Sequence, residues 1–167
     1  MKALINTFIV ALILLGGNVA VAQNSKADKE AAQEKSIKNK IDSATYTFKA
    51  TWINPVRGIG RTLVTDNYDV RVTKDSVIAY LPYFGRVYMK APINSSDGGL
   101  KFTSTNFDYK AVPKKKGGYR VTINIKDSDK ANRLFFDISK NGTATLSTTG
   151  NYRDPINFNG NIVGNKN

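Results

Sequence analysis

The sequence contains no cysteine and no histidine. Their absence excludes disulfides, thiolate nucleophiles and the Ser-His-Asp and Cys-His catalytic arrangements, and it removes the side chains that most zinc sites use. Any chemistry must come from Asp, Glu, Lys, Arg, Tyr, Ser or Thr. We therefore expect no metal site and no cofactor, and we favour a function that is not enzymatic.

Long hydrophobic runs are also missing, except at the N-terminus. Met1 and Lys2 precede an apolar run that ends near Leu15, and Ala20-Val21-Ala22 follows it. The run is shorter than the ~20 residues that cross a bilayer, and Ala-x-Ala is typical of signal-peptidase cleavage sites. We predict a signal peptide over residues 1–22, a periplasmic or secreted product, and no transmembrane span after cleavage.

Acidic side chains are few: 13 Asp and Glu stand against 25 Lys and Arg, a net charge of +12. A basic surface favours anionic partners. Because we expect export, we predict no nucleic-acid partner, which leaves acidic glycans, lipid phosphates and other envelope components. The alternative is that the lysines keep a β-protein soluble and protect its sheet edges.

Residues 23–43 differ in composition from the rest of the chain, since Ala, Lys, Glu and Gln dominate them. Glu34 and Lys38 have the spacing of a helical ion pair, and Ile37 and Ile41 fall on one helical face. We predict a helical or flexible N-terminal segment. Its C-terminal end docks on the rest of the protein, or else the whole segment frays.

From residue 44 the period of the hydrophobic pattern changes to two, which is typical of half-buried strands. The first row is Tyr46, Phe48, Ala50 and Trp52, and similar rows recur as far as Ile162. Short turn signals separate the rows, the strongest being Asn141-Gly142, and such turns join antiparallel strands. We predict that residues 44–167 form a single all-β domain. It is an antiparallel meander of about nine or ten strands, closed into a barrel or curled sandwich.

One aromatic-rich strand is interrupted by Pro82 and Gly85, which is typical of an edge, bulge or corner. Aromatic rings beside a guanidinium can stack on a sugar ring or hold a carboxylate. Two more arginines, next to Gly58 and Gly60, could add anion contacts. The candidate ligand-binding residues are Tyr83, Phe84, Arg86, Tyr88, Arg57 and Arg61. In the alternative interpretation these aromatics fill the core at a corner and residues 55–60 form a plain loop.

The run Lys114-Lys115-Lys116 before Gly117-Gly118 predicts a hairpin tip. It either binds acidic glycans or lipid headgroups, or is simply a solvated loop.

Several segments resemble a known family. They are Leu81–Arg86, Gly98–Phe102, the lysine run before Gly117-Gly118, Gly142–Leu146 and Pro155–Gly160. On these segments the chain is similar to domain-of-unknown-function family 4251, small exported proteins of Bacteroides-like bacteria. The resemblance implies an envelope location and an all-β domain. It implies no activity and no catalytic residue.

Three functions remain open from the sequence. The leading one is a non-enzymatic binding module for an anionic or carbohydrate-like ligand or an envelope partner. The second is a hydrolase that acts on envelope carbohydrate through an Asp pair, although the aspartates fall at turns or at outward strand positions. The third is a structural or assembly subunit that pairs through a sheet edge.

Overall fold

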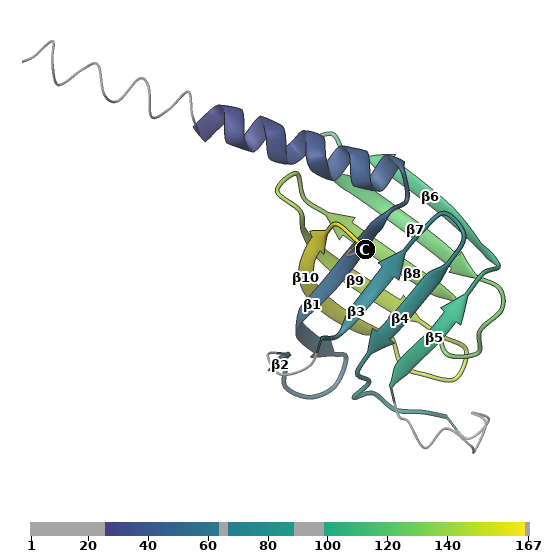
Figure 1. The fold of residues 1–167 in the computed structure, drawn as a ribbon. Coiled ribbons are helices and arrows are strands. Elements are labelled where there is room, and N and C mark those ends of the chain that lie inside the picture. Colours follow the sequence, from purple (N-terminus) through teal and green to yellow (C-terminus); the bar gives the residue numbers. More distant parts are fainter. Residues whose placement is uncertain (1–25, 64–66, 89–98, 166–167) are drawn as a thin grey trace, which may run out of the picture.

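The computed structural model describes residues 26–63, 67–88 and 99–165, so the predicted signal peptide lies outside the described residues. A helix over residues 26–42 leads into one antiparallel sheet of ten strands (Figure 1). The predicted all-β antiparallel fold with an N-terminal helix is therefore confirmed. The strands are β1 (Tyr46–Pro55), β2 (Arg61–Thr62), β3 (Asp69–Val72), β4 (Val77–Leu81), β5 (Leu100–Ser104), β6 (Phe107–Pro113), β7 (Tyr119–Ile125), β8 (Arg133–Ile138), β9 (Thr143–Thr149) and β10 (Ile156–Val163).

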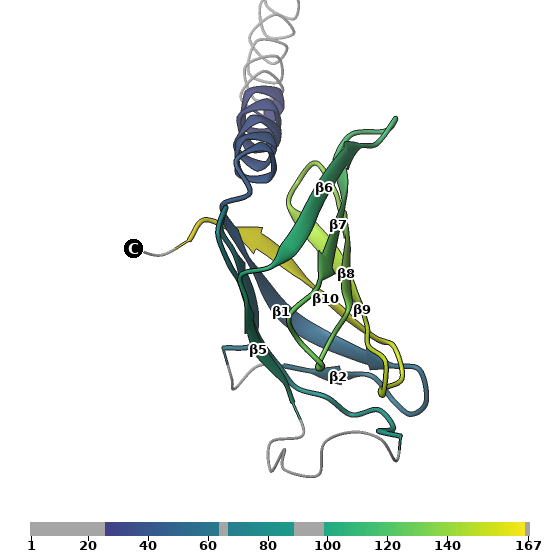
Figure 2. The same cartoon turned by 90° about the vertical axis from the view of Figure 1, so that its right-hand side faces the viewer.

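The sheet curls into a nearly closed barrel. Its strand order is β5-β4-β3-β1-β10-β9-β8-β7-β6, and the short β2 pairs with β1. The two end strands, β5 and β6, follow each other in the chain but are not hydrogen-bonded neighbours, so the barrel opens between them (Figure 2). Antiparallel neighbours and short turns give the meander that the sequence predicted, with the β1–β10 pair joining its two halves.

Asp127 stabilises the corner between β5 and β6. Its Oδ1 accepts a hydrogen bond from Ser104 Oγ at 2.5 Å. Its Oδ2 accepts from the backbone N–H groups of Thr105 and Asn106 at 2.9 and 3.0 Å. These bonds lower the pKa of the Asp127 carboxyl, and the bond from Ser104 has the largest effect.

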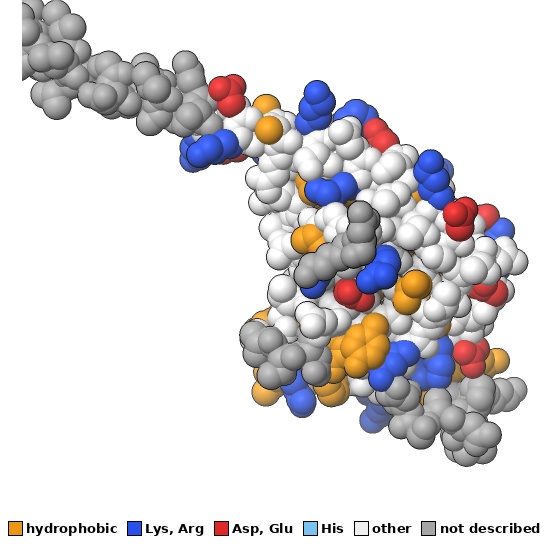
Figure 3. Space-filling view, in the orientation of Figure 1, with side chains coloured by type: hydrophobic (Ala, Val, Ile, Leu, Met, Phe, Trp, Pro, Cys, Tyr) orange, Lys and Arg blue, Asp and Glu red, His pale blue; other side chains and the backbone are white. Residues whose placement is uncertain are grey.

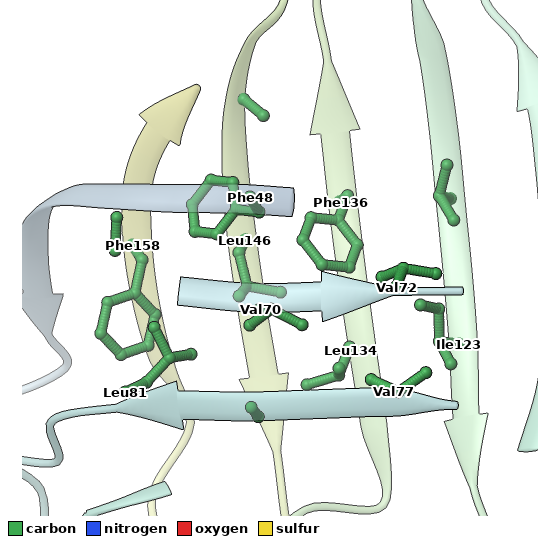
Figure 4. Packing of buried hydrophobic residues seen from close by; sticks show 14 of the residues in the cluster. Phe48, Val70, Val72, Val77, Leu81, Ile123, Leu134, Phe136, Leu146 and Phe158 are labelled. Carbon is green, nitrogen blue, oxygen red and sulfur yellow. The ribbon is translucent and has the colours of Figure 1, made fainter. Parts of the chain in front are cut away.

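The inward side chains fill the barrel with one apolar cluster, because alternate residues of each strand face the interior. Phe136 lies at its centre, with the rings of Tyr46 and Phe48 edge-on to it at centroid distances of 6.2 and 5.6 Å. Figure 4 shows side chains of β3 and β4 packed against those of β8, β9 and β10. Side chains thus occupy the centre of the barrel.

The N-terminal helix docks through its C-terminal half, one of the two expectations for this segment. Ile37 and Ile41 are buried, and Tyr109 Oη donates a 2.8 Å hydrogen bond to the Ile41 carbonyl. Gly142 has φ of +85°, and a Cβ there would lie 2.8 Å from Ile37 Cδ1. The absence of a side chain at Gly142 therefore allows both the left-handed backbone of the β8–β9 turn and the close approach of the helix.

The predicted inward position of Trp52 is wrong. A bulge between Ala50 and Trp52 shifts the register of β1, so Ile53 takes the buried place. Trp52 pairs with Thr62 of β2 and is 38% exposed. Its indole N–H donates to Asn54 Oδ1 at 2.7 Å.

Candidate functional site

Three connections meet at the end of the barrel opposite the helix: residues 55–61, which run from the last residue of β1 to the first of β2, residues 82–88 after β4, and residues 150–155 between β9 and β10. We call this the loop end. The first two connections meet where the Arg61 guanidinium lies over the Phe84 ring, 4.9 Å from its centroid. The second and third meet through an antiparallel bridge between Val87 and Arg153. The candidate residues of the two separate sequence segments therefore lie on one surface.

Backbone hydrogen bonds fix residues 82–88 on the β9–β10 connection. The Tyr88 N–H donates to the Tyr152 carbonyl at 2.9 Å, and the Asp154 N–H donates to the Arg86 carbonyl at 3.1 Å. The predicted interruption of the strand occurs as expected, because β4 ends at Leu81 and Pro82 follows it. A fixed loop of this kind can present side chains in a defined arrangement.

Tyr83 stabilises this loop through hydrogen bonds and a ring contact. Its Oη donates to the carbonyls of Arg86 and Asp154 at 2.8 and 3.1 Å, and the buried Arg153 guanidinium lies 4.9 Å from its ring centroid. Desolvation raises the pKa of the Tyr83 hydroxyl. A Cβ on Gly85 would lie 2.4 Å from Tyr83 Oη. The absence of a side chain at Gly85 therefore leaves room for the Tyr83 hydroxyl. Among the candidates, Tyr83 thus has a structural role and packs against the core, as the alternative interpretation of these aromatics expected.

Phe84 and Tyr88 are the exposed aromatics of the loop, 47% and 53% accessible. Tyr88 Oη donates a short hydrogen bond to Asp154 Oδ1, and this bond raises the pKa of the Tyr88 hydroxyl. The positive charges of Arg57 and Arg86 act on the pKa of the same hydroxyl in the opposite direction. The loop end thus combines aromatic rings with guanidinium groups.

The loop end is both cationic and apolar. Within the described ranges, Arg57, Arg61 and Arg86 are exposed and form no ion pair with a carboxylate. Six of the exposed large hydrophobic side chains gather here: Trp52, Val56, Ile59, Phe84, Val87 and Tyr88. The space-filling view shows hydrophobic and Lys or Arg side chains side by side at this end (Figure 3). Contiguous exposed apolar patches are a common feature of interaction surfaces, so the loop end is the candidate site.

The carboxylates of the described residues give no support to a hydrolase. Asp42, Asp108 and Asp137 form separate ion pairs with Lys38, Lys126 and Lys114. A glycosidase general acid needs a raised pKa, whereas the shift at Asp127 is downward. Over the described ranges, Asp and Glu form no group of three or more that could hold a metal ion.

A pocket of about 1080 Å³ lies at the other end of the barrel, between the N-terminal helix and the tips of the β6–β7 and β8–β9 hairpins. The lysine run lines it together with Glu30, Gln33 and Asn141. Lys114 is partly exposed and forms an ion pair with Asp137. The sequence identified the lysine run as a candidate site. It did not predict that the helix and the β8–β9 hairpin line the same pocket, because no local pattern reveals contacts between distant segments.

Within the described part of the chain, no helix has both the length and the apolar character needed to cross a bilayer.

Comparison with known proteins agrees with this architecture. The family model for a domain of unknown function, DUF4251, matches residues 28–162. The chain belongs to the DUF4251 family. This confirms the resemblance noted in the sequence. A DUF4251 protein from Bacteroides eggerthii DSM 20697, known from a crystal structure at 1.95 Å resolution, has a similar fold with a TM-score of 0.59. The two chains are 13% identical, and the match covers 81% of this chain and 91% of the other. At that identity the likeness shows the fold alone. No curated protein matches the sequence.

Proposed function

We propose that this DUF4251 protein is a non-enzymatic binding module whose loop end holds an acidic sugar. The observation that carries the proposal is the contact between Arg61 and Phe84, which joins two candidate segments on an exposed surface. Arg57, Arg86 and Tyr88 belong to the same loop end. The ligand class follows from the chemistry of these side chains.

Each component suits one part of an acidic sugar. The exposed faces of Phe84 and Tyr88 can pack against the C–H face of a pyranose ring. An arginine fork binds a carboxylate through two parallel hydrogen bonds, which is why arginine is favoured at carboxylate sites. With no ion pair to a described carboxylate, the three arginines need not give up a partner of that kind to bind a ligand.

Calorimetric titration with trigalacturonate tests the proposal, with its neutral methyl ester as the ligand control. We expect the wild type to bind the acid and to bind the ester at least about tenfold more weakly, because charge-assisted hydrogen bonds are lost. Phe84→Ala should weaken binding of the acid. The matched control is Tyr80→Ala, because Tyr80 is also an exposed aromatic with a cation, Lys101, 4.7 Å from its centroid. Equal losses in both variants would refute the site.

A second candidate function is docking to an anionic membrane surface. Ile59 is 87% exposed and Val56 61% exposed, and they lie in the loop that carries Arg57 and Arg61. Apolar side chains flanked by cations are typical of segments that lie in the interface of anionic membranes. Sedimentation with vesicles containing phosphatidylglycerol tests this function. Ile59→Asp should abolish membrane binding while sparing trigalacturonate binding, and wild-type protein that stays in the supernatant would rule it out.

We also propose that the protein is exported, on the basis of the apolar N-terminal run and Ala20-Val21-Ala22. N-terminal sequencing of the protein from its native cells tests this: the mature chain should begin at Gln23. A chain that retains Met1 in the cytoplasm would contradict it.

A further inference from the structure

We propose that the pocket between the N-terminal helix and the two hairpin tips is a second anion site, which takes a phosphate-bearing ligand. This inference is independent of the proposed function, because the pocket and the loop end lie at opposite ends of the barrel. The strand register places them there: β1 begins beside Val72 at the helix end and finishes with Pro55 opposite Ile156 at the loop end.

The charge of the pocket wall favours an anion. Five cationic side chains and two acidic ones line it: Lys114, Lys115, Lys116, Arg120 and Lys140 against Glu30 and Asp137. Asp137 is already neutralised, since Lys114 Nζ lies 2.5 Å and Arg120 Nε 3.7 Å from its oxygens. Lys115, Lys116 and Lys140 form no ion pair within the described ranges. They therefore supply an uncompensated positive charge to the cavity.

The walls are held in place before any ligand arrives. Gln33 Nε2 donates a 2.6 Å hydrogen bond to the Asn141 carbonyl, which ties the helix to the β8–β9 tip. A Cβ on Gly117 would lie 3.3 Å from Glu34 Oε1 and 3.6 Å from Lys140 Cβ, so the β6–β7 tip lies close to both. Because ligand sites are usually preformed concavities, this contact between three elements distinguishes the pocket from a bare lysine loop.

The type of cation distinguishes the two ends of the barrel. Lysine ammonium groups are compact point charges with rotatable donors, which suit tetrahedral phosphate oxygens, whereas the arginine fork suits planar carboxylates. Three of the lysines that line the pocket (Lys115, Lys116 and Lys140) and three arginines of the loop end (Arg57, Arg61 and Arg86) form no ion pair with a described residue. The pocket volume, about 1080 Å³, leaves room for a phosphate together with the group that carries it, either a free sugar phosphate or the phosphate headgroup of a lipid.

Two binding assays at physiological salt distinguish these sources. The first titrates glucose 6-phosphate by calorimetry, and the second measures sedimentation with phosphatidylcholine vesicles doped with phosphatidic acid. We expect saturable binding in at least one assay. Lys115→Ser/Lys116→Ser and, separately, Lys140→Ser should weaken it about tenfold. Glu30→Gln should strengthen it, because one acidic side chain leaves the wall.

The matched control is Lys74→Ser/Lys110→Ser, which removes the same charge from two exposed lysines that do not line the pocket. It should bind like the wild type, and all variants should retain the wild-type circular dichroism spectrum. Binding in the vesicle assay alone identifies a lipid headgroup, and binding of the free sugar phosphate identifies a soluble ligand. No binding in either assay, or an equal loss in the control, overturns the proposal. Neither assay measures trigalacturonate binding, so a negative result in both would not contradict the proposed function.

Discussion

The guanidinium of Arg61 lies over the ring of Phe84, 4.9 Å from its centroid, although Arg61 belongs to β2 and Phe84 to the connection after β4. The stack gives both side chains a fixed place at the loop end. It also leaves Phe84 47% exposed, so the ring remains available to a ligand.

Arg61→Lys keeps the charge but removes the flat group that stacks. We expect affinity for trigalacturonate to fall about 2- to 5-fold, the equivalent of the ~0.5–1 kcal/mol of an exposed cation–π contact. Arg71→Lys, at an exposed outward position of β3, is the control and should change nothing. Unchanged affinity in Arg61→Lys would show that the stack plays no part in recognition.

Gly85→Ala should weaken trigalacturonate binding by disturbing the loop. The new Cβ would lie 2.4 Å from Tyr83 Oη and would displace it from the carbonyls of Arg86 and Asp154. A double-mutant cycle in calorimetry tests the cause. In a Tyr83→Phe background, Gly85→Ala should reduce the affinity for trigalacturonate by a smaller factor, because the hydroxyl that the new Cβ would displace is absent. Strict additivity of the two substitutions would contradict this contact.

Gly142→Ala should destabilise the protein by about 1–2 kcal/mol, the cost of a left-handed conformation for a residue with a Cβ. It should also loosen the N-terminal helix, because the Cβ would meet Ile37 Cδ1 at 2.8 Å. Urea unfolding measures the first effect and amide exchange of residues 26–42 the second. Gly164→Ala, where the nearest atom would be Lys40 Cε at 3.8 Å, should have little effect on either.

The hydrogen bonds to Asp127 make part of the stability pH-dependent. They lower its folded pKa, so the stabilisation is fully present above the unfolded pKa of about 3.9 and is lost as pH falls through the folded value. Asp127→Asn should therefore lower the urea midpoint at pH 7, and the difference from wild type should shrink towards pH 2. A difference that stays constant with pH would contradict the role of the carboxylate.

Local patterns in the sequence predicted most of the fold. Alternation identified the buried rows of Tyr46 and Phe48, and Asn141-Gly142 marked a turn that does join two antiparallel strands. The position of Trp52 was predicted wrongly because a one-residue bulge reverses the side of the sheet to which the following side chains of the strand point. Alternation alone does not reveal a bulge.

The candidate site was predicted only in part, for a related reason. Aromatic and arginine content singled out residues 57–61 and 83–88, and the structure brings them together at the loop end. The contact between Tyr83 and Asp154, however, depends on a long-range bridge between two connections. The pocket at the helix end likewise needs three elements from distant parts of the chain. Such contacts follow from tertiary packing and leave no local signature.

Amide chemical-shift mapping with trigalacturonate tests the central claim most directly. We predict saturable shifts confined to residues 57–61, 84–88 and 152–154, with the pocket lysines and the outer face of β4 unaffected. Shifts spread evenly over the basic surface, shifts centred on the pocket, or no shifts at all would contradict the assignment of the loop end as the acidic-sugar site.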